Sequence, residues 1–261
     1  MRIPLYQVDA FADRPFAGNP AAVCPLESWL SDEVMQAIAA ENNLPETAFF
    51  VAEGERWGLR WFTPTTEVDL CGHATLASAY VLFNFLTPGR ERVVFRTQKA
   101  GELVVTRAGA LLALDFPAWP PTPCDEPPGL SAALGQRPAA VLAARDYVAV
   151  YDDMERVAAL APDFAALAQL DRFAVIATAP GAGEIDFVSR FFAPAQGVDE
   201  DPVTGSSHCA LVPYWAGRLG KTRLEARQLS RRGGRLSCAL DGDRVTIAGR
   251  AALYLTGTIE I

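Results

Sequence analysis

Hydrophobic and polar positions divide the first half of the chain into short strands and two helices. Residues 32–42 place apolar side chains such as Val34 and Ile38 on one helical face, and Ser31 before them is a residue type that caps helix N-termini. Residues 73–86 are apolar almost all round, which predicts a helix buried inside a sheet or barrel. The remaining apolar runs predict strands at residues 3–8, 47–52, 58–63, 92–97, 101–107 and 110–115.

The second half of the chain repeats this order of elements. Apolar runs predict strands at residues 147–151, 173–178, 185–193, 224–229, 234–240 and 244–249. Helical patterns occupy residues 154–161 and 206–218, and we expect Pro213 to interrupt the second because proline lacks the N–H of a helical hydrogen bond. A last strand at residues 252–261 has no counterpart in the first half.

Internal similarity at half the chain length indicates a tandem duplication. Residues 60–64 and 190–194 share the pattern Arg-aromatic-Phe-x-Pro at an offset of 130 residues, and Gly72 meets Gly205 at an offset of 133. Chance similarity between two β-rich segments is the alternative. Several matches in one register, with one small insertion, favour duplication.

We therefore predict an α+β fold of two similar domains, each a β-sheet or barrel wrapped around a central helix. The first domain covers residues 1–118, and the strand at 252–261 can return to complete its sheet. The second domain covers residues 129–251. Between them, residues 117–128 hold six prolines, a composition that predicts a linker.

Composition and charge exclude several classes of protein. The 261 residues are 50% hydrophobic and 21% charged, which provides a packed core and excludes global disorder. The net charge is −8 and no basic block extends beyond Arg231 and Arg232, so we expect no nucleic-acid partner. No apolar stretch reaches the roughly 18 residues of a membrane-spanning helix, and we expect no membrane association.

Cysteine usage and the N-terminus predict a cytoplasmic protein. The five cysteines form an odd number without a repeating spacing, which argues against a disulfide framework and favours a reducing compartment. The first residues lack the basic region and apolar run of a signal peptide.

A glycine stands directly before the buried helix of each half, at Gly72 and at Gly205. Glycine allows a tight turn that exposes backbone N–H groups, and the helix dipole adds positive potential there. Gly72–His73 and Gly205–Ser206 are therefore candidates for holding the carboxylate of a small substrate. Ordinary helix entry is the alternative at either position.

The two histidines of the chain, His73 and His208, both stand at these helix starts beside Cys71 and Cys209. A zinc site can be imagined from the four, but their spacing matches no common zinc pattern, and we predict no metal. A Cys-His hydrolase is equally weakly supported, because Cys71 and His73 are too close in sequence to align as nucleophile and base.

Two carboxylates have sequence contexts that suit chemistry. Glu46 precedes the apolar residues 47–50, an environment that can raise a carboxyl pKa toward the range of an acid/base catalyst. Asp201 ends an acidic run just before Gly205. For each of them a solvated loop carboxylate is the alternative.

Taken together, these motifs resemble the PhzF-like isomerases of phenazine biosynthesis. The motifs are Asp9-Ala10-Phe11, Gly18-Asn19-Pro20, Asn43-Leu44-Pro45-Glu46-Thr47, Gly72-His73-Ala74-Thr75 and Asp201-Pro202-Val203-Thr204-Gly205-Ser206. The resemblance covers nearly the whole chain. It implies two domains of the diaminopimelate-epimerase type, no cofactor and a homodimer.

The resemblance also assigns roles to residues. Glu46 matches the acid/base that shuttles the proton, and His73 and Asp201 match side chains that orient the substrate. The backbone amides of Gly72, His73, Gly205 and Ser206 match groups that hold its carboxylate. The predicted function is a cofactor-independent isomerase that moves a proton on a small carboxylate-bearing substrate.

Two other functions stay open at this point. Related epimerases use two thiols, one at each helix start, whereas here Cys71 is matched by Thr204 in the second half. One thiol cannot serve both faces of a carbon, which disfavours racemisation, but a racemase or epimerase that pairs Cys71 with Glu46 is an alternative. A small-molecule-binding protein that has lost turnover is the other.

Overall fold

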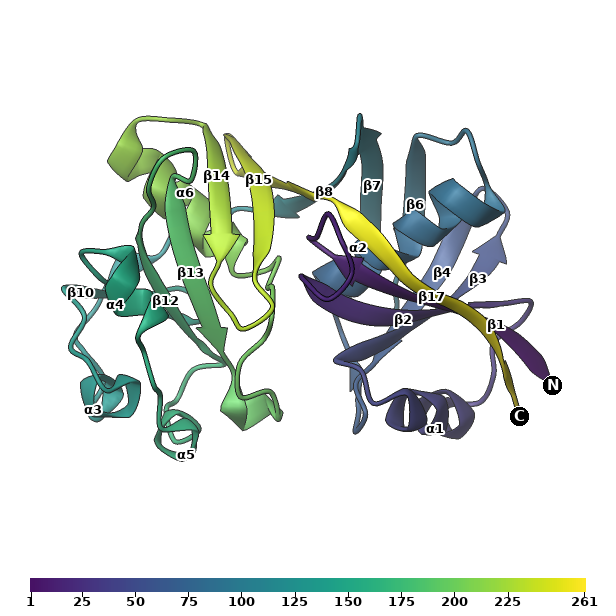
Figure 1. Cartoon of the computed structure of the whole chain (residues 1–261), viewed down its shortest axis with the longest axis horizontal. Helices are drawn as coiled ribbons and strands as arrows, with labels where there is room; N and C mark the ends of the chain where they lie inside the picture. Colours follow the sequence, from purple (N-terminus) through teal and green to yellow (C-terminus); the bar gives the residue numbers. More distant parts are fainter. The chain divides into compact units, whose positions relative to one another are not determined.

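The computed structural model describes residues 1–261, and the chain divides into two compact units. The first unit contains residues 1–115 and 248–261, and the second contains residues 116–247. Each is a mixed β-sheet with a long helix packed on it (Figure 1). No helix combines the length and apolar character that a membrane crossing requires.

The first unit is built from nine strands and two helices. Its strands are β1 (Arg2–Ala10), β2 (Asn19–Leu26), β3 (Glu46–Glu53), β4 (Arg56–Phe62), β5 (Glu67–Val68), β6 (Arg92–Arg96), β7 (Glu102–Ala108), β8 (Leu111–Pro117) and β17 (Ala251–Glu260). The helices are α1 (Asp32–Asn42) and α2 (Gly72–Val81), and a π-helical turn, Leu82–Leu86, extends α2. The C-terminal strand β17 pairs antiparallel with β1 along its whole length.

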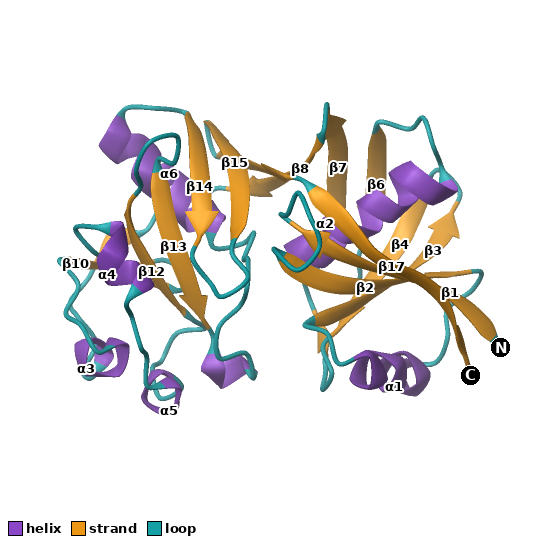
Figure 2. Cartoon of the chain, viewed as in Figure 1, coloured by secondary structure: helices purple, strands orange, loops and turns teal.

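Local sequence explains both helices of the first unit. The Ser31 hydroxyl accepts a hydrogen bond from Val34 N at 3.4 Å, which confirms the predicted cap of α1. Helix α2 packs against β1, β2, β3, β7 and β17, so strands surround it (Figure 2). This position accounts for its composition, because a helix without a solvent face needs apolar or hydrogen-bonded side chains all round.

The second unit has the other strands and four helices. The strands are β9 (Thr122–Pro123), β10 (Ala140–Ala143), β11 (Tyr147–Val150), β12 (Val175–Pro180), β13 (Phe187–Phe192), β14 (Arg223–Gln228), β15 (Gly234–Asp241) and β16 (Arg244–Gly249), the last of which leads back to the first unit. The helices are α3 (Leu130–Leu134), α4 (Met154–Ala158), α5 (Phe164–Leu167) and α6 (His208–Leu219). Helix α6 packs against β14 and β15.

Strand pairing follows the same order in both units. In the first unit, β3–β4 is antiparallel, β4–β6 parallel and β6–β7 antiparallel. In the second unit, β12–β13 is antiparallel, β13–β14 parallel and β14–β15 antiparallel. The long helix stands between the two parallel strands along the chain in each case. A parallel pair needs such a crossover, so each buried helix is the connection that its sheet requires.

The repeated Arg-aromatic-Phe motif forms matching ion pairs. Arg60 binds Glu67 through two bonds of 2.7 Å, and Arg190 binds Glu200 through bonds of 2.7 and 2.9 Å. Each guanidinium also lies over the ring of the Phe two residues later, at 5.1 Å and 5.0 Å. Bidentate carboxylates and aromatic rings compensate a buried guanidinium, so this motif is structural.

One expected feature of α6 is wrong, because the helix continues through Pro213 without a break. Proline lacks the N–H that would bind the carbonyl of Cys209. Trp119 N donates to that carbonyl at 2.8 Å instead, so the group is not left unpaired. The proline-rich segment is thus packed on α6, and it contributes β9, which pairs with β10.

Candidate active site

The loop between β1 and β2 delivers Asn19 to the buried end of α2. Gly18 has φ +65°, and a Cβ atom there would lie 2.1 Å from the carbonyl oxygen of Ala10. Only glycine fits this turn. Asn19 begins β2 opposite Ala10, and its side chain is fully buried.

Glu46 is the first residue of β3 and follows the left-handed C-cap residue of α1, Asn43. Its side chain is only 16% exposed, and its Oε2 atom lies 3.0 Å from Nε2 of His73. The contact is close but not aligned as a hydrogen bond, and neither atom has a hydrogen-bond partner. Glu46 is therefore not the solvated loop carboxylate that the sequence left open.

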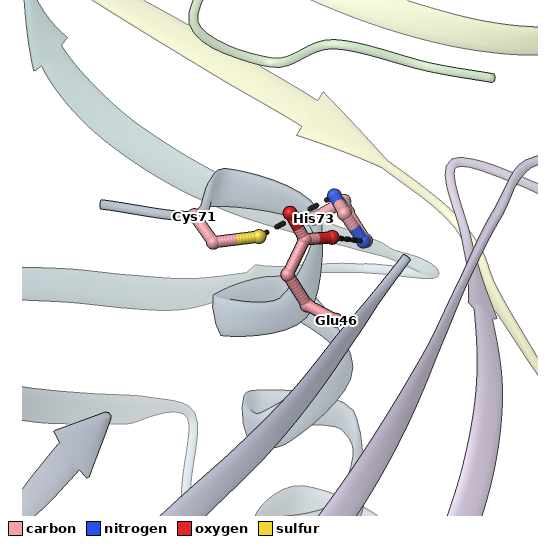
Figure 3. Close-up of side chains that lie close together, drawn as sticks. All are labelled: Glu46, Cys71 and His73. Atoms are coloured by element: carbon pink, nitrogen blue, oxygen red, sulfur yellow. Dashed lines mark hydrogen bonds and ion pairs between the residues drawn. The ribbon is translucent and has the colours of Figure 1, made fainter. Parts of the chain in front are cut away.

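His73 is the second residue of α2, and its imidazole is held from two sides. Its Nδ1 atom lies 3.1 Å from Nδ2 of Asn19 and 3.5 Å from Sγ of Cys71, while Nε2 faces Glu46. Figure 3 shows the Cys71, His73 and Glu46 side chains converging on one another. No side chain caps the first turn of α2, which begins at Gly72.

Charge and burial set the protonation of this group. Burial raises the pKa of the Cys71 thiol to about 11, with the Glu46 carboxylate adding to the effect, so the thiol is neutral near pH 7. Burial opposes the charged form of His73, but Cys71 and Glu46 outweigh it and raise the pKa of His73 well above its ordinary value.

The ligand atoms of Glu46, Cys71 and His73 lie within 4.8 Å of one another, so these are the residues that could hold a metal ion. His73 turns Nδ1 toward Cys71 and Nε2 toward Glu46, however, so its nearest contacts with the other two residues use opposite ring nitrogens. A protonated thiol is also a poor ligand. The geometry suits proton transfer better than metal binding.

In the second unit, Asp201 and Thr204 form a braced turn ahead of α6. The Thr204 hydroxyl donates to Oδ2 of Asp201 at 2.5 Å. The buried Gln228 accepts from Thr204 N at 2.9 Å and donates to the Asp201 carbonyl at 2.7 Å. Gly205 and Ser206 follow directly, in tight turns that place the start of α6 at His208 rather than at 206.

Arg145 approaches the same turn from the loop between β10 and β11. Its Nη2 atom donates to Ser206 Oγ at 3.4 Å. Its Nε and Nη2 atoms also donate to the Asp146 carboxylate, at 3.0 and 2.9 Å. The guanidinium lies 4.6 Å from the centre of the Phe173 ring. The guanidinium brings positive charge to the predicted carboxylate-binding turn.

His208, by contrast, has a structural environment. Its Nδ1 donates to the Thr204 carbonyl at 2.9 Å, and its ring centre lies 5.7 Å from that of Phe187. Burial lowers the pKa of His208 to about 4, so the ring is neutral near pH 7. His208 and Cys209 are not among the residues whose ligand atoms gather closely enough to hold a metal ion.

Known proteins resemble this chain over nearly its whole length. The family model described as "Phenazine biosynthesis-like protein" matches residues 8–257. The chain belongs to this PhzC–PhzF family. A Pseudomonas aeruginosa protein named as an uncharacterized isomerase is 57% identical over 261 residues, which is 100% of both chains.

Solved structures show the same family and fold. The crystal structure of a phenazine biosynthesis protein of the PhzF family from Enterococcus faecalis matches with a TM-score of 0.97 and 49% identity over 100% of both chains. A hydroxyproline epimerase from Agrobacterium vitis matches with a TM-score of 0.61 and 10% identity, covering 99% of this chain and 92% of that one. The mixed α/β fold is therefore shared with an epimerase.

The predicted site residues of this family member fall into two groups, one in each unit. Glu46, Gly72 and His73 lie together in the first unit, while Asp201, Gly205 and Ser206 lie together in the second, with the last two at adjacent positions. Sequence reasoning assigned no role to Asn19, Arg145 or Gln228. Asn19 belongs to a quoted motif, but nothing in the sequence links Arg145 or Gln228 to the site.

Proposed function

We propose that this isomerase moves a proton on a small carboxylate-bearing substrate without a cofactor, and that Glu46 carries the proton. The observation that carries the proposal is the Glu46 carboxylate, which is largely buried and 3.0 Å from His73 at the start of α2. A base must be shielded from water yet held by neighbours, and Glu46 meets both requirements. The names of the relatives as isomerases support the reaction class.

The reaction balances without any added reactant. One Glu46 oxygen takes the proton from a carbon next to the substrate's conjugated carboxylate, and the C–H electron pair moves into that conjugated system. Glu46 then returns the proton to another carbon of the same system, and the electron pair forms the new C–H bond. The enzyme ends in its starting state.

Backbone N–H groups would stabilise the negative charge that develops. The uncapped start of α2 at Gly72 and His73 offers such groups together with the positive end of a helix dipole. Gly205 and Ser206, beside the Arg145 guanidinium, offer a second set. Asp201, held by Thr204, would orient a hydroxyl or ammonium group of the substrate.

An internal duplication would explain why each unit offers such a helix start. The common order of strand pairing and the matching Arg60–Glu67 and Arg190–Glu200 ion pairs support this origin.

We also propose a cytoplasmic homodimer. The five free cysteines support the compartment, and light scattering tests the oligomeric state.

Solvent deuterium exchange tests the proposed reaction. The protein is incubated in D₂O with a panel of small unsaturated carboxylic acids, and each acid is then analysed by mass spectrometry. We expect deuterium uptake into at least one acid with wild-type protein, and none with Glu46→Gln. Because Glu46 can return the same proton, the isomerised product is measured as well, and binding of these acids with neither exchange nor isomerisation would assign the protein to the non-catalytic binders.

Replacing Cys71 with alanine separates proton shuttling from thiol-based racemisation. A thiol with a pKa of about 11 is a poor base near pH 7, so we expect turnover by Cys71→Ala to change by less than about tenfold. Cys24→Ala is the matched control, because Cys24 is another buried cysteine of the first unit. Loss of turnover in Cys71→Ala alone, measured in the exchange assay, would favour the racemase.

For Asp201→Ala we expect a milder effect. The variant removes the oxygen that accepts the Thr204 hydroxyl, so substrate orientation should suffer and KM should rise by about tenfold. Asp199→Ala, at an exposed position of the same acidic run, should match the wild type. Kinetics on the exchanging acid measure both. Wild-type kinetics in Asp201→Ala would remove Asp201 from the site.

A further inference from the structure

The contact between Asn19 and His73 has a consequence for where the His73 proton resides. The Asn19 amide nitrogen lies 3.1 Å from Nδ1, and both side chains are buried. The opposite ring nitrogen, Nε2, lies 3.0 Å from Glu46. The ring is therefore held through one nitrogen while the other faces the carboxylate.

We infer that Asn19 is a positioning residue for the proton transfer: by holding Nδ1 of His73, it keeps a proton on Nε2, facing Glu46. The inference rests on the proposed function of Glu46. A neutral His73 then keeps its N–H on the side of the Glu46 carboxylate, whose Oε2 lies 3.0 Å from Nε2.

A carboxamide is suited to this task in both charge states of the ring. When His73 is neutral, the amide N–H donates to Nδ1, and the ring proton stays on Nε2. When His73 is protonated, the amide oxygen can accept from Nδ1–H after a flip of the side chain. An aspartate at position 19 can only accept, so it would draw the proton of a neutral ring to Nδ1. The lone pair of Nε2 would then face the Glu46 carboxylate.

The fold places Asn19 and Glu46 through the same pair of strands. Strands β2 and β3 are parallel, and Ala21 is the register partner of Glu46. Asn19 stands two residues earlier on β2, opposite Ala10 of β1. The turn at Gly18 and the pairing of β2 with β1 and β3 thus fix the backbone that carries the amide.

Nitrogen NMR of the two histidine rings tests the inference on the intact protein without substrate. His208 is an internal reference with the opposite tautomer, because its ring is neutral and its proton lies on Nδ1, which donates to the Thr204 carbonyl. The His73 ring faces Glu46 on β3, Cys71 before α2 and Asn19 on β2. Because Cys71 and Glu46 raise the pKa of His73, the spectra are recorded at a pH high enough to make the ring neutral. We expect the Nε2–H tautomer for His73 and the Nδ1–H tautomer for His208.

Variants of Asn19 extend the test to turnover. In Asn19→Asp we expect His73 to switch to the Nδ1–H tautomer and kcat to fall by about a hundredfold, with a smaller change in KM. Asn19→Ser, whose shorter side chain loses the contact, is the second variant and should give mixed tautomers. The matched control is Asn84→Asp, because Asn84 is exposed and bonds Tyr80 and Arg107 only.

The outcomes separate this inference from the proposed function. An Nδ1–H tautomer of His73 in the wild type overturns the inference, whether or not the variants fold. An unchanged tautomer and unchanged kcat in folded Asn19 variants also overturn it. Either result leaves the role of Glu46 intact, since that role fails only if Glu46→Gln keeps exchanging deuterium.

Discussion

Glu46→Gln should lose at least about a thousandfold in turnover, because an amide cannot take up a proton from carbon near neutral pH. Substrate affinity should change by less than about tenfold, since glutamine has the same shape and keeps the side chain beside His73. Deuterium exchange measures the first quantity, and calorimetric titration of the exchanging acid measures the second.

The control for this variant is Glu41→Gln, which makes the same change at an exposed position of α1. It should behave as wild type. A second readout needs no substrate: the Glu46 carboxylate raises the pKa of His73, so Glu46→Gln should lower that pKa in an NMR titration. If Glu46→Gln retained wild-type exchange, the proton would have to travel through another group.

Hydrophobic periodicity predicted the long helices α1, α2 and α6, because each has a clear physical demand. The short helices α3 and α5 were not predicted, since five and four residues are too few to show a period. Helix α1 has an apolar face and a serine cap, and α2 is apolar all round because strands surround it. Strand β2 was not predicted, since its sequence carries Pro20 and Pro25, which are depleted in strands. Its eight residues are nevertheless mostly buried, between β1 and β3.

The chemistry of the site was predicted less completely, because contacts over long sequence separations leave no local pattern. The family resemblance singled out Glu46 and His73, but only the packing of α2 on β3 shows that the two side chains meet. Asn19 lies 54 residues from His73, and Arg145 lies 61 residues from Ser206. The Pro213 error has the same origin, since the Cys209 carbonyl that Pro213 cannot bind accepts a hydrogen bond from the distant Trp119 N–H.

Gly18→Ala should destabilise the first unit by about 3 kcal/mol or more, because it adds a steric clash to backbone strain. At φ +65°, an alanine Cβ would lie 2.1 Å from the Ala10 carbonyl oxygen and 2.8 Å from the Ala12 Cβ. Neither neighbour can turn aside as a flexible side-chain end would. Urea unfolding followed by tryptophan fluorescence measures the loss.

Gly54→Ala measures the effect of backbone strain without the steric clash that Gly18→Ala adds. Gly54 has φ +66°, almost the same backbone conformation, but nothing lies within 4 Å of its added Cβ, so we expect a loss of only about 1 kcal/mol. Gly18→Ala should also shift the ring signals of His73, since the turn at Gly18 sets the position of Asn19, whereas Gly54→Ala should leave them unchanged. Equal destabilisation by the two variants, with His73 undisturbed in both, would mean that the turn does not determine where Asn19 lies.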